Sequence, residues 1–444
     1  MNEIGVGVVG CGNISTIYLT NLPHVPGVKL RAVADMRPEV AQAQGKNFGV
    51  PVMPVDALLA HDDIQVVVNL TVPAAHGAVS LAALSANKHV FSEKPLAVDV
   101  ALGRKVVEEA EKRNLMVGCA PDTFLGAGGR LSRKLIDEGK VGRILSGTAF
   151  LMSHGMEHWH PDPEFFFKPG GGPVLDVGVY YLTALVNLLG PVARVHATTS
   201  TGFAERIVTS DGPRKGYRIK VETPTTCLAL LEFVSGALLP FVATWDVWKH
   251  THPPIELYGT DGSLRIPDPN FYGGVVETSD RSGDWVRHDS QSMPLGRANW
   301  PAEAPTRANY RALGVADMIA ALRSGRAHHA SGRLALHVLE VMEAIVSGGD
   351  SAMSPAERPA VFQEADAATV FTAAVAGPAP GRKRPAKKAA AKTPKKKAAR
   401  KPVAKKKTAK KKAAKKKTPA RAKRPTAKKG SARKRPAKKA RRGR

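Results

Sequence analysis

The sequence is poor in cysteine, with three in 444 residues. Cys11, Cys119 and Cys227 are scattered and form no CxxC pair, which argues against a disulfide framework and against a cysteine-ligated metal site. No apolar run approaches the ~18 residues typical of a membrane-spanning helix, and the first residues lack the charged and apolar regions of a secretory signal. These absences predict an intracellular protein of the cytoplasm.

Acidic residues are missing from the end of the chain. Residues 381–444 contain no Asp or Glu but 33 of the 66 Lys and Arg, so residues 1–380 carry 33 − 38 = −5 charges. Self-repulsion and the scarcity of apolar residues predict a disordered segment over 376–444. This Lys/Ala/Pro-rich stretch resembles a histone-H1 tail, which implies non-specific nucleic-acid binding and nucleoid association. The alternative is a tail that increases solubility or binds polyphosphate.

The first 120 residues alternate short apolar runs with helical stretches. Strands are expected at 4–9, 30–34 and 66–70 and in the stretch 89–95, with helical stretches at 78–87 and 98–113. This rhythm predicts an α/β domain of the Rossmann type over 1–120, with a doubly wound parallel sheet. In such sheets the ligand lies beyond the carboxyl ends of the strands.

A glycine-rich turn follows the first strand. It reads G-x-G-x-x-S over 10–15, with Gly10 for the tight turn and Gly12 for close approach of a pyrophosphate. Asn13 and Ile14 begin the following helix, whose free N–H groups would face that anion. The position between a strand and a helix favours dinucleotide binding over a purely structural turn.

The second strand ends at an acidic residue, Asp35, at the spacing expected for a ribose ligand. Its carboxylate would accept hydrogen bonds from the adenosine ribose and repel a 2′-phosphate, so NAD is favoured as the cofactor. Arg37 could instead pair with such a phosphate, which leaves NADP open.

The segment from His89 to Pro95 places one lysine at the edge of the sheet. Pro95 cannot continue a strand, so the chain turns there and leaves Lys94 at the ligand side. Taken alone, this segment favours an ordinary surface lysine, and the motifs around it reverse that preference. The third strand is followed by Thr71, Pro73 and His76 at the start of a helix that also faces the cofactor.

Three motifs together resemble the Gfo/Idh/MocA oxidoreductase family, which includes glucose–fructose oxidoreductase and inositol dehydrogenase. They are the segments 10–15, 71–76 and 88–97, and the resemblance extends over roughly residues 1–372. It implies that Lys94 is a catalytic-site lysine, that the peptide before Pro95 can be cis, and that Glu93 lies at the cofactor.

Residues 121–375 lose the strand–helix alternation and predict an α+β domain. Strands are expected at 225–233, 237–245 and 255–258, in a mostly antiparallel sheet. Helical stretches at 130–138, 177–189, 312–324 and 332–346 would cover one face. The resemblance implies an open-faced sheet that commonly forms the oligomer interface, so we expect a homo-oligomer.

A stripe of polar residues marks the helix at 177–189. Asp176, Tyr180, Thr183 and Asn187 follow at helical spacing and share one face, which suggests the wall of a cavity. An ordinary solvated face is the alternative, although such faces usually carry Lys or Glu.

This segment departs from the family pattern, in which a His and an Asp stand where this chain has Tyr180 and Thr183. A tyrosine there resembles the glucose–fructose oxidoreductase branch. The inositol-type assignment is correspondingly weakened.

Three histidines lie close together at 154, 158 and 160. Their spacing matches no zinc pattern, so we expect no metal. Substrate hydrogen bonding by His158 and His160 is the favoured interpretation, with Trp159 as a platform for a sugar ring.

These residues predict a dehydrogenase that transfers a hydride between nicotinamide and a hydroxyl or oxo carbon of a sugar, polyol or related molecule. Tyr180 would be the acid/base, assisted by the Lys94 ammonium. Asp176 would either accept a hydrogen bond from the substrate hydroxyl or fix Lys94. The alternative is a catalytically retired scaffold that serves as a nucleic-acid-binding protein.

Overall fold

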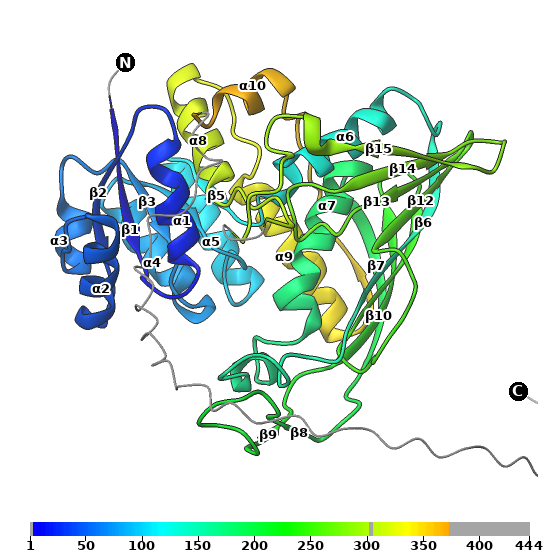
Figure 1. The fold of residues 1–444 in the computed structure, drawn as a ribbon, viewed down its shortest axis with the longest axis horizontal. Coiled ribbons are helices and arrows are strands. Elements are labelled where there is room, and N and C mark those ends of the chain that lie inside the picture. The colour runs from blue at the N-terminus through cyan, green and yellow to red at the C-terminus, as the bar shows by residue number, and fades with distance from the viewer. Residues whose placement is uncertain (1–2, 302–304, 373–444) are drawn as a thin grey trace, which may run out of the picture. The chain divides into compact units, whose positions relative to one another are not determined.

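The computed structural model describes residues 3–301 and 305–372 (Figure 1). The basic segment expected from residue 376 onward lies outside the described residues. None of the helices in the described part of the chain is long and apolar enough to cross a membrane.

The first sheet has five parallel strands in the order β2-β1-β3-β4-β5. Its strands are β1 (Ile4–Val9), β2 (Val28–Ala34), β3 (Val66–Asn69), β4 (His89–Ser92) and β5 (Val117–Cys119). Its helices are α1 (Ser15–Asn21), α2 (Pro38–Phe48), α3 (Val55–Ala60), α4 (Pro73–Ser85) and α5 (Val100–Lys112). The predicted Rossmann sheet is therefore confirmed. Strands β2 and β3 lie on opposite sides of β1, so the strand order reverses at β1. In parallel sheets such a reversal leaves a crevice at the carboxyl ends of the strands involved, here β1 and β3.

The second sheet has nine strands in the order β15-β14-β13-β12-β6-β11-β10-β7-β16. Among its strand pairs, only β6 and β11 run parallel, so the prediction of a mostly antiparallel sheet is also confirmed. Its strands are β6 (Ile144–Met152), β7 (Val192–Ser200), β10 (Thr226–Phe233), β11 (Leu238–Thr244), β12 (Ile255–Gly259), β13 (Ser263–Ile266), β14 (Val275–Ser279), β15 (Trp285–Asp289) and β16 (Gly349–Ala352).

One face of the second sheet is covered by helices and the other is open. Figure 1 shows α7 (Val179–Leu189) and α9 (Gly332–Ser347) between the two sheets, with α6 (Ala127–Asp137) nearby. Side chains along each strand accordingly alternate between a buried and an exposed face. In β10, Leu231 is buried while Leu228 and Leu230 are exposed. Leu238 of β11 is exposed on the same side. These leucines make part of the open face apolar, and the expected self-association stays a prediction.

Helix α8 (Leu313–Ser324) packs on the first sheet, so the expectation that it covers the second sheet is wrong. Gly118 of β5 allows the contact, because a Cβ there would lie 2.7 Å from the Met318 methyl carbon. Gly314, on α8 itself, faces the Phe91 ring in the same way. An apolar helix face predicts burial but not which of two sheets buries it.

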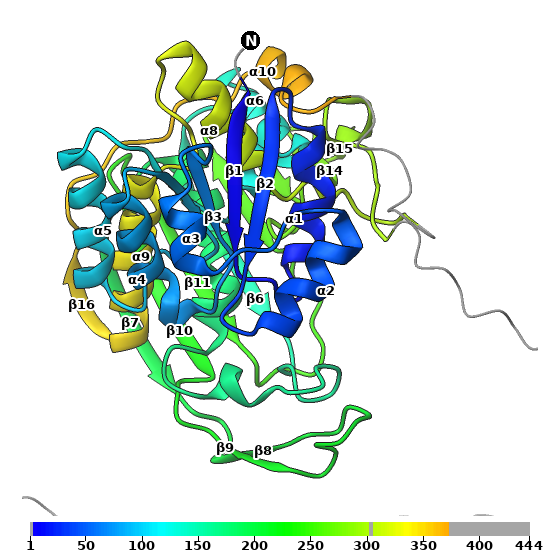
Figure 2. The same ribbon diagram turned by 90° about the vertical axis from the view of Figure 1, so that its left-hand side faces the viewer.

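A small third layer lies beneath both sheets in Figure 1 and below the first sheet in Figure 2. It contains the hairpin β8 (Glu205–Ile207) and β9 (Arg218–Lys220) and the short helix η3 (Glu164–Phe167). It has its own hydrophobic cluster, separate from the main core, made of Phe166, Phe167, Val208, Ile219 and Trp245. The last described helix is α10 (Glu364–Thr369).

Candidate active site

The glycine turn after β1 has the geometry that a dinucleotide requires. Gly10 has φ +100°, and a Cβ there would lie 2.5 Å from the Leu70 carbonyl carbon, so only glycine fits. A Cβ at Gly12 would meet no heavy atom within 4 Å. The backbone at Gly12 therefore faces open space that a pyrophosphate can enter. The turn is braced by the Ser15 hydroxyl, which donates to the Gly12 carbonyl at 2.7 Å, while Asn13 and Ile14 connect it to α1.

Asp35 joins this turn to the end of β2. Its carboxylate accepts hydrogen bonds from the backbone N–H groups of Cys11 at 2.8 Å and Arg37 at 2.9 Å. The Arg37 Nε lies 3.5 Å from the same carboxylate. Burial, and then the Asp35 charge, raise the pKa of the Cys11 thiol to about 11, so this thiol stays neutral beside the cofactor crevice. Asp35 is thus fixed at the crevice with its charge already paired to Arg37.

The loop after β3 is tied to the loop after β4 through a histidine. His76 is buried, and its ring nitrogens lie 2.7 Å from the Pro95 carbonyl oxygen and 3.0 Å from that of Thr71. The Thr71 hydroxyl donates to the Asn69 side chain at 2.7 Å. His76, beyond Pro73 at the start of α4, therefore braces the lysine-bearing loop, and its role as a cofactor contact stays a prediction.

Lys94 follows the end of β4 and contacts Asp176 of the second domain. The Lys94–Pro95 peptide is cis, as the family resemblance implied. The Lys94 ammonium donates to the Asp176 carbonyl oxygen at 2.6 Å and to its carboxylate at 2.9 Å. Burial would lower the pKa of Lys94, but the Asp176 charge and then Tyr180 outweigh it and raise that pKa above its ordinary value. Lys94 is therefore a fixed ammonium ion.

Glu93 holds the backbone of Lys94 through its carboxylate. It is buried and accepts hydrogen bonds from the Tyr18 hydroxyl of α1 at 2.8 Å and from the Lys94 backbone N–H at 3.0 Å. Helix α1, which follows the glycine turn, thereby contacts the residue that precedes the lysine.

Asp176 and Tyr180 come from the start of the helix that faces Lys94. Asp176 lies in a π-helical turn (η4, Val174–Gly178) that leads into α7. Of the two roles left open for Asp176, its geometry matches the one that fixes Lys94. Tyr180 lies one turn further on, and the Lys94 Nζ is 5.5 Å from the centre of its ring. The structure thus brings Lys94, Asp176 and Tyr180 together, and their catalytic roles stay a prediction.

Arg311 is the residue of this cluster that the sequence did not reveal. Its guanidinium donates to the Tyr180 hydroxyl at 3.3 Å, across a separation of 131 residues. No motif marks the segment before α8, and the left-handed backbone that the structure shows at Ala312 (φ +81°) is not one that an alanine predicts.

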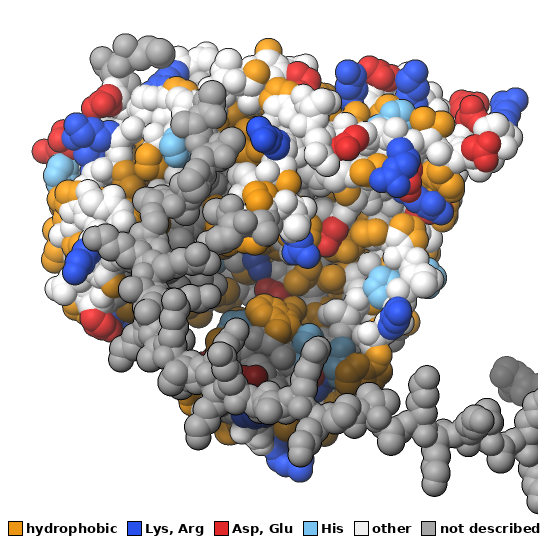
Figure 3. Space-filling view, in the orientation of Figure 1, with side chains coloured by type: hydrophobic (Ala, Val, Ile, Leu, Met, Phe, Trp, Pro, Cys, Tyr) orange, Lys and Arg blue, Asp and Glu red, His pale blue; other side chains and the backbone are white. Residues whose placement is uncertain are grey.

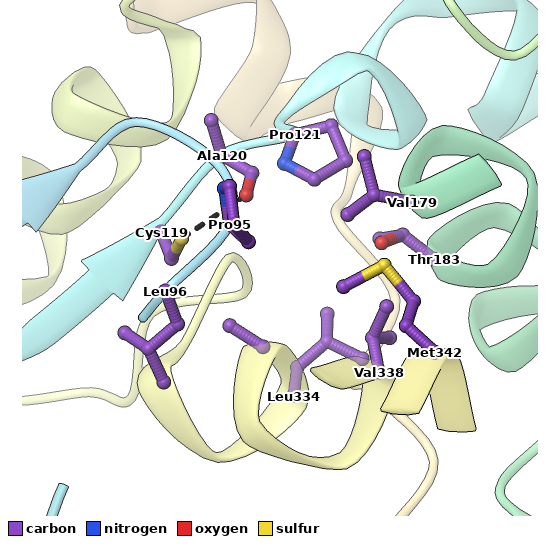
Figure 4. A pocket seen from close by; sticks show the side chains of 11 residues that line it. Pro95, Leu96, Cys119, Ala120, Pro121, Val179, Thr183, Leu334, Val338 and Met342 are labelled. Carbon is purple, nitrogen blue, oxygen red and sulfur yellow. Dashed lines mark hydrogen bonds between the residues drawn. The ribbon is translucent and has the colours of Figure 1, made fainter. Parts of the chain in front are cut away.

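The predicted polar stripe does not line a single cavity. Thr183 lies on a small, mostly apolar hollow behind Pro95, beside Leu334 and Met342 of α9 (Figure 4). Asn187 instead accepts hydrogen bonds from Arg133. All residues of helix α7 are buried. Its polar side chains therefore contact different parts of the protein and do not line one shared cavity, so the interpretation of the stripe as a cavity wall is wrong.

The histidine segment lies in the loop between β6 and η3. His158 and Trp159 are exposed, and Trp159 has 57% of its surface accessible. His160 packs edge-on against Phe166, and His154 stacks on Trp248 with ring centres 3.3 Å apart. Figure 3 shows a hollow in this part of the molecular face, where hydrophobic and histidine side chains gather. No group of three His, Cys, Asp or Glu among the described residues could hold a metal ion.

Comparison with known protein families gives two matches along this chain. Residues 4–120 match the oxidoreductase family with an NAD-binding Rossmann fold, named GFO/IDH/MocA. Residues 130–265 match the GFO/IDH/MocA C-terminal domain. The two matches contain the Gly10 turn and Lys94 in the first domain, and Asp176 with Tyr180 in the second.

Several characterised relatives are dehydrogenases. The chain is 25% identical over 336 residues to the levoglucosan dehydrogenase of Pseudarthrobacter phenanthrenivorans, an alignment that covers 68% of this chain and 85% of the relative. It is 26% identical over 285 residues to the myo-inositol 2-dehydrogenase of Thermotoga maritima, covering 63% and 79%.

Solved structures share the fold. A levoglucosan dehydrogenase in complex with NADH superposes with a TM-score of 0.68 at 21% identity, covering 80% of this chain and 100% of that chain. An oxidoreductase from Agrobacterium radiobacter, in complex with NAD+, L-tartaric acid and magnesium, gives 0.65 at 18% identity, with 79% and 98% covered.

Proposed function

The chain belongs to the GFO/IDH/MocA oxidoreductase family and binds NAD, and from this premise we propose that it is a sugar or polyol dehydrogenase. The reaction would move a hydride between NAD and a hydroxyl or oxo carbon of the substrate. One observation carries the proposal: at the carboxyl edge of the NAD-binding sheet, Asp176 fixes the Lys94 ammonium beside Tyr180.

Each of the three side chains has a distinct task in this mechanism. When bound, NAD+ would supply the hydride acceptor for oxidation of the substrate, and NADH the hydride donor for reduction. Tyr180 takes the proton of the substrate hydroxyl during oxidation and gives it back during reduction. Lys94 uses two of its N–H donors on Asp176, and its third donor stabilises the negative charge that develops on the substrate oxygen. Asp176 holds this lysine in position.

The substrate class follows from the relatives and from the exposed loop. Relatives named for levoglucosan and myo-inositol act on small molecules with several hydroxyl groups. Trp159 offers an exposed aromatic face, and sugar rings pack well on such faces. We therefore assign the substrate ring to Trp159, with His158 and His160 as hydrogen-bonding partners and Thr183 further inside.

A panel of cyclic polyols, anhydro sugars and their oxo forms, each supplied with NAD+ or NADH, tests the proposal. We expect a change in nicotinamide absorbance with at least one polyol, and loss of that turnover in Tyr180→Phe. A full-length chain that binds NADH but turns over no compound of the panel would instead favour the retired scaffold.

We expect the protein to bind NADH at least about tenfold more tightly than NADPH, because the Asp35 carboxylate would repel a 2′-phosphate. Asp35→Ser should narrow this preference, since Arg37 is then released from its carboxylate partner. Fluorescence titration of both cofactors measures the difference. Equal affinities in the unaltered protein would contradict this role of Asp35.

A second activity is favoured by the charge segregation of the sequence. Residues 381–444 combine 33 Lys and Arg with no acidic residue, whereas residues 1–380 have a net charge of −5. We propose that this segment binds nucleic acid through its phosphates, independently of the dehydrogenase site.

The full-length chain should bind duplex DNA of any sequence, with an affinity that falls by roughly 0.9 logarithmic units per neutralised phosphate for each tenfold rise in salt. Deleting residues 381–444 should abolish this binding and leave kcat/KM within about twofold, because the deleted residues lie outside both family matches. Mobility-shift titrations at several salt concentrations measure the DNA affinity of both chains and its salt dependence. Retained DNA binding by the truncated chain would refute the assignment.

A further inference from the structure

Exposed aromatic side chains are concentrated in one part of the described chain. Six Phe, Tyr and Trp side chains are exposed among residues 3–301 and 305–372. Five of them lie in the third layer and in the loops beside it, and we call these five the aromatic surface: Trp159, Phe165, Phe203, Tyr217 and Trp248. The sixth, Trp300, lies in the segment before α8. A single exposed aromatic side chain is ordinary, whereas such a concentration indicates a binding surface.

Trp248 forms a flat platform within the aromatic surface. Its ring stacks on the His154 ring, with centres 3.3 Å apart and planes inclined by 17°, so one face of the indole is covered. Trp248 is nevertheless 82% exposed, so its other face is open to solvent. Burial, and then the Arg206 charge, lower the pKa of His154, and a neutral imidazole packs well against an indole. Trp248 is therefore supported on one side and free to bind a ligand on the other.

The loop that carries Trp159 leads into the turn that carries Asp176. The Gly172 N–H donates to the Phe166 carbonyl oxygen of η3 at 2.8 Å. The Asp176 N–H in turn donates to the Gly172 carbonyl oxygen at 3.1 Å. Tyr180 follows one turn later, at the start of α7. The aromatic surface is thus joined to the proposed acid/base through η3 and a short glycine segment.

Trp248 lies in a loop that is paired with the first loop. Strands β6 and β11 run parallel, so their carboxyl ends lie side by side. In the loops that follow them, the Val247 N–H donates to the Ser153 carbonyl oxygen at 3.0 Å. Phe241 of β11 also lies against η4, because a Cβ at Gly178 would be 3.4 Å from its ring. Strand β11 thus passes the η4 turn of the proposed active site and then ends in the loop of Trp248.

We infer that the aromatic surface is a second sugar subsite, in which Trp248 holds a ring joined by a glycosidic bond to the ring at Trp159. The ring at Trp159 undergoes the oxidation or reduction, and the ring at Trp248 contributes affinity only. The substrate class is therefore glycosides and disaccharides. This inference rests on the proposed function, which assigns the reacting ring to Trp159. The exposed Lys249, next to Trp248, can donate hydrogen bonds to the hydroxyl groups of the second ring.

A sugar chain fits the aromatic surface better than a protein partner does. The surface continues into the loop and turn of the proposed active site, so one elongated molecule can occupy both. Hydrogen-bond donors also lie among its rings, since the Arg214 guanidinium carbon is 4.2 Å from the centre of the Tyr217 ring. A sugar ring presents C–H faces and hydroxyl groups together, and this surface offers a partner for each.

Affinities measured on matched sugars test the subsite without any turnover. The probes are the methyl glycosides of glucose, galactose, mannose and xylose, each beside the methyl glycosides of its α- and β-linked disaccharides. Ligand-observed NMR titrations use the full-length chain with NADH bound, because NADH takes no hydride from compounds that carry only hydroxyl groups. In at least one series we expect the disaccharide to bind about 5- to 30-fold more tightly than the monosaccharide.

Variants of the exposed tryptophans assign this gain to one side chain. Trp248→Ala should remove the gain and leave the affinity for the monosaccharide within about twofold, because only the second ring touches Trp248. Trp248→Phe keeps an aromatic face and should retain part of the gain. Trp300→Ala is the matched control, since Trp300 is an exposed tryptophan outside the aromatic surface, and it should retain the gain in full.

Three outcomes would overturn the inference. The first is that no disaccharide binds more tightly than its monosaccharide. The second is that Trp248→Ala keeps the gain, or that Trp300→Ala loses it equally. The third is that Trp248→Ala dissociates an oligomer of the full-length chain, which would make the aromatic surface a protein interface.

The same titrations separate this inference from the proposed function. A gain that depends on Trp248, in a chain that turns over no sugar or polyol, would refute the dehydrogenase and keep the subsite. Turnover of a monosaccharide or cyclic polyol without any such gain would keep the dehydrogenase and refute the subsite.

Discussion

Lys94→Met should lower kcat/KM by about 10²- to 10³-fold, the range expected when a hydrogen-bond donor to a developing negative charge is lost. The Lys94 ammonium is the only group of the described residues that both pairs with Asp176 and lies over the Tyr180 ring. Its removal leaves the negative charge on the substrate oxygen without a donor. The affinity for NADH should change little, because the Gly10 turn and Asp35 remain.

Steady-state kinetics on the substrate found in the panel, together with NADH fluorescence titration, measure these two effects separately. Lys105→Met is a suitable control, since Lys105 is an exposed lysine of α5. The loss of kcat/KM in Asp176→Asn should lie between those of Lys94→Met and Lys105→Met. This variant keeps a hydrogen-bond acceptor but removes the charge that holds Lys94. Near-normal kcat in Lys94→Met would show that Lys94 is not part of the chemistry.

Local patterns predicted four of the five strands of the first sheet, because each of the four is a short apolar run followed by a residue with a special role. The three-residue strand β5 was not predicted. The run at 4–9 ends at Gly10, whose positive φ excludes a side chain, and the run at 89–92 ends before the Lys94–Pro95 peptide. These constraints act within a few residues along the chain, so the sequence displays them directly.

Contacts between distant segments were predicted much less well. The pairing of Lys94 with Asp176 spans 82 residues and was expected only because the family resemblance brought the two segments together. Arg311 reaches Tyr180 from 131 residues away, in a segment without a motif. Helix α8 was assigned to the wrong sheet for the same reason, since periodicity shows which face is buried but not the partner.

The loop that carries Trp159 is attached to the second sheet through one buried arginine. Arg206 of β8 has about 4% of its side chain exposed and pairs with Glu157 and Asp246. It also donates to the backbone carbonyl oxygen of Trp245 at 3.0 Å. Because Glu157 lies in the loop and Asp246 follows β11, Arg206 joins the hairpin, the loop and the sheet.

Arg206→Met should destabilise the protein by about 3–5 kcal/mol, because both carboxylates would remain buried without their cation. The side chains of Glu157 and Asp246 are only 6% and 15% exposed, so water cannot replace the lost partner fully. We expect the melting temperature to fall by several degrees and KM for the substrate to rise, since the loop with Trp159 loses its attachment. Differential scanning fluorimetry and kinetics measure the two effects.

Two further variants separate charge from packing in this prediction. Arg218→Met removes an exposed arginine of the same hairpin, whose pair with Glu205 lies in solvent, and should change stability by less than about 1 kcal/mol. Combining Arg206→Met with Glu157→Gln removes one of the stranded charges and should recover part of the lost stability. If the double variant is no more stable than Arg206→Met, the loss comes from the contacts of Arg206 with Phe167 and Phe203 and not from unpaired charge.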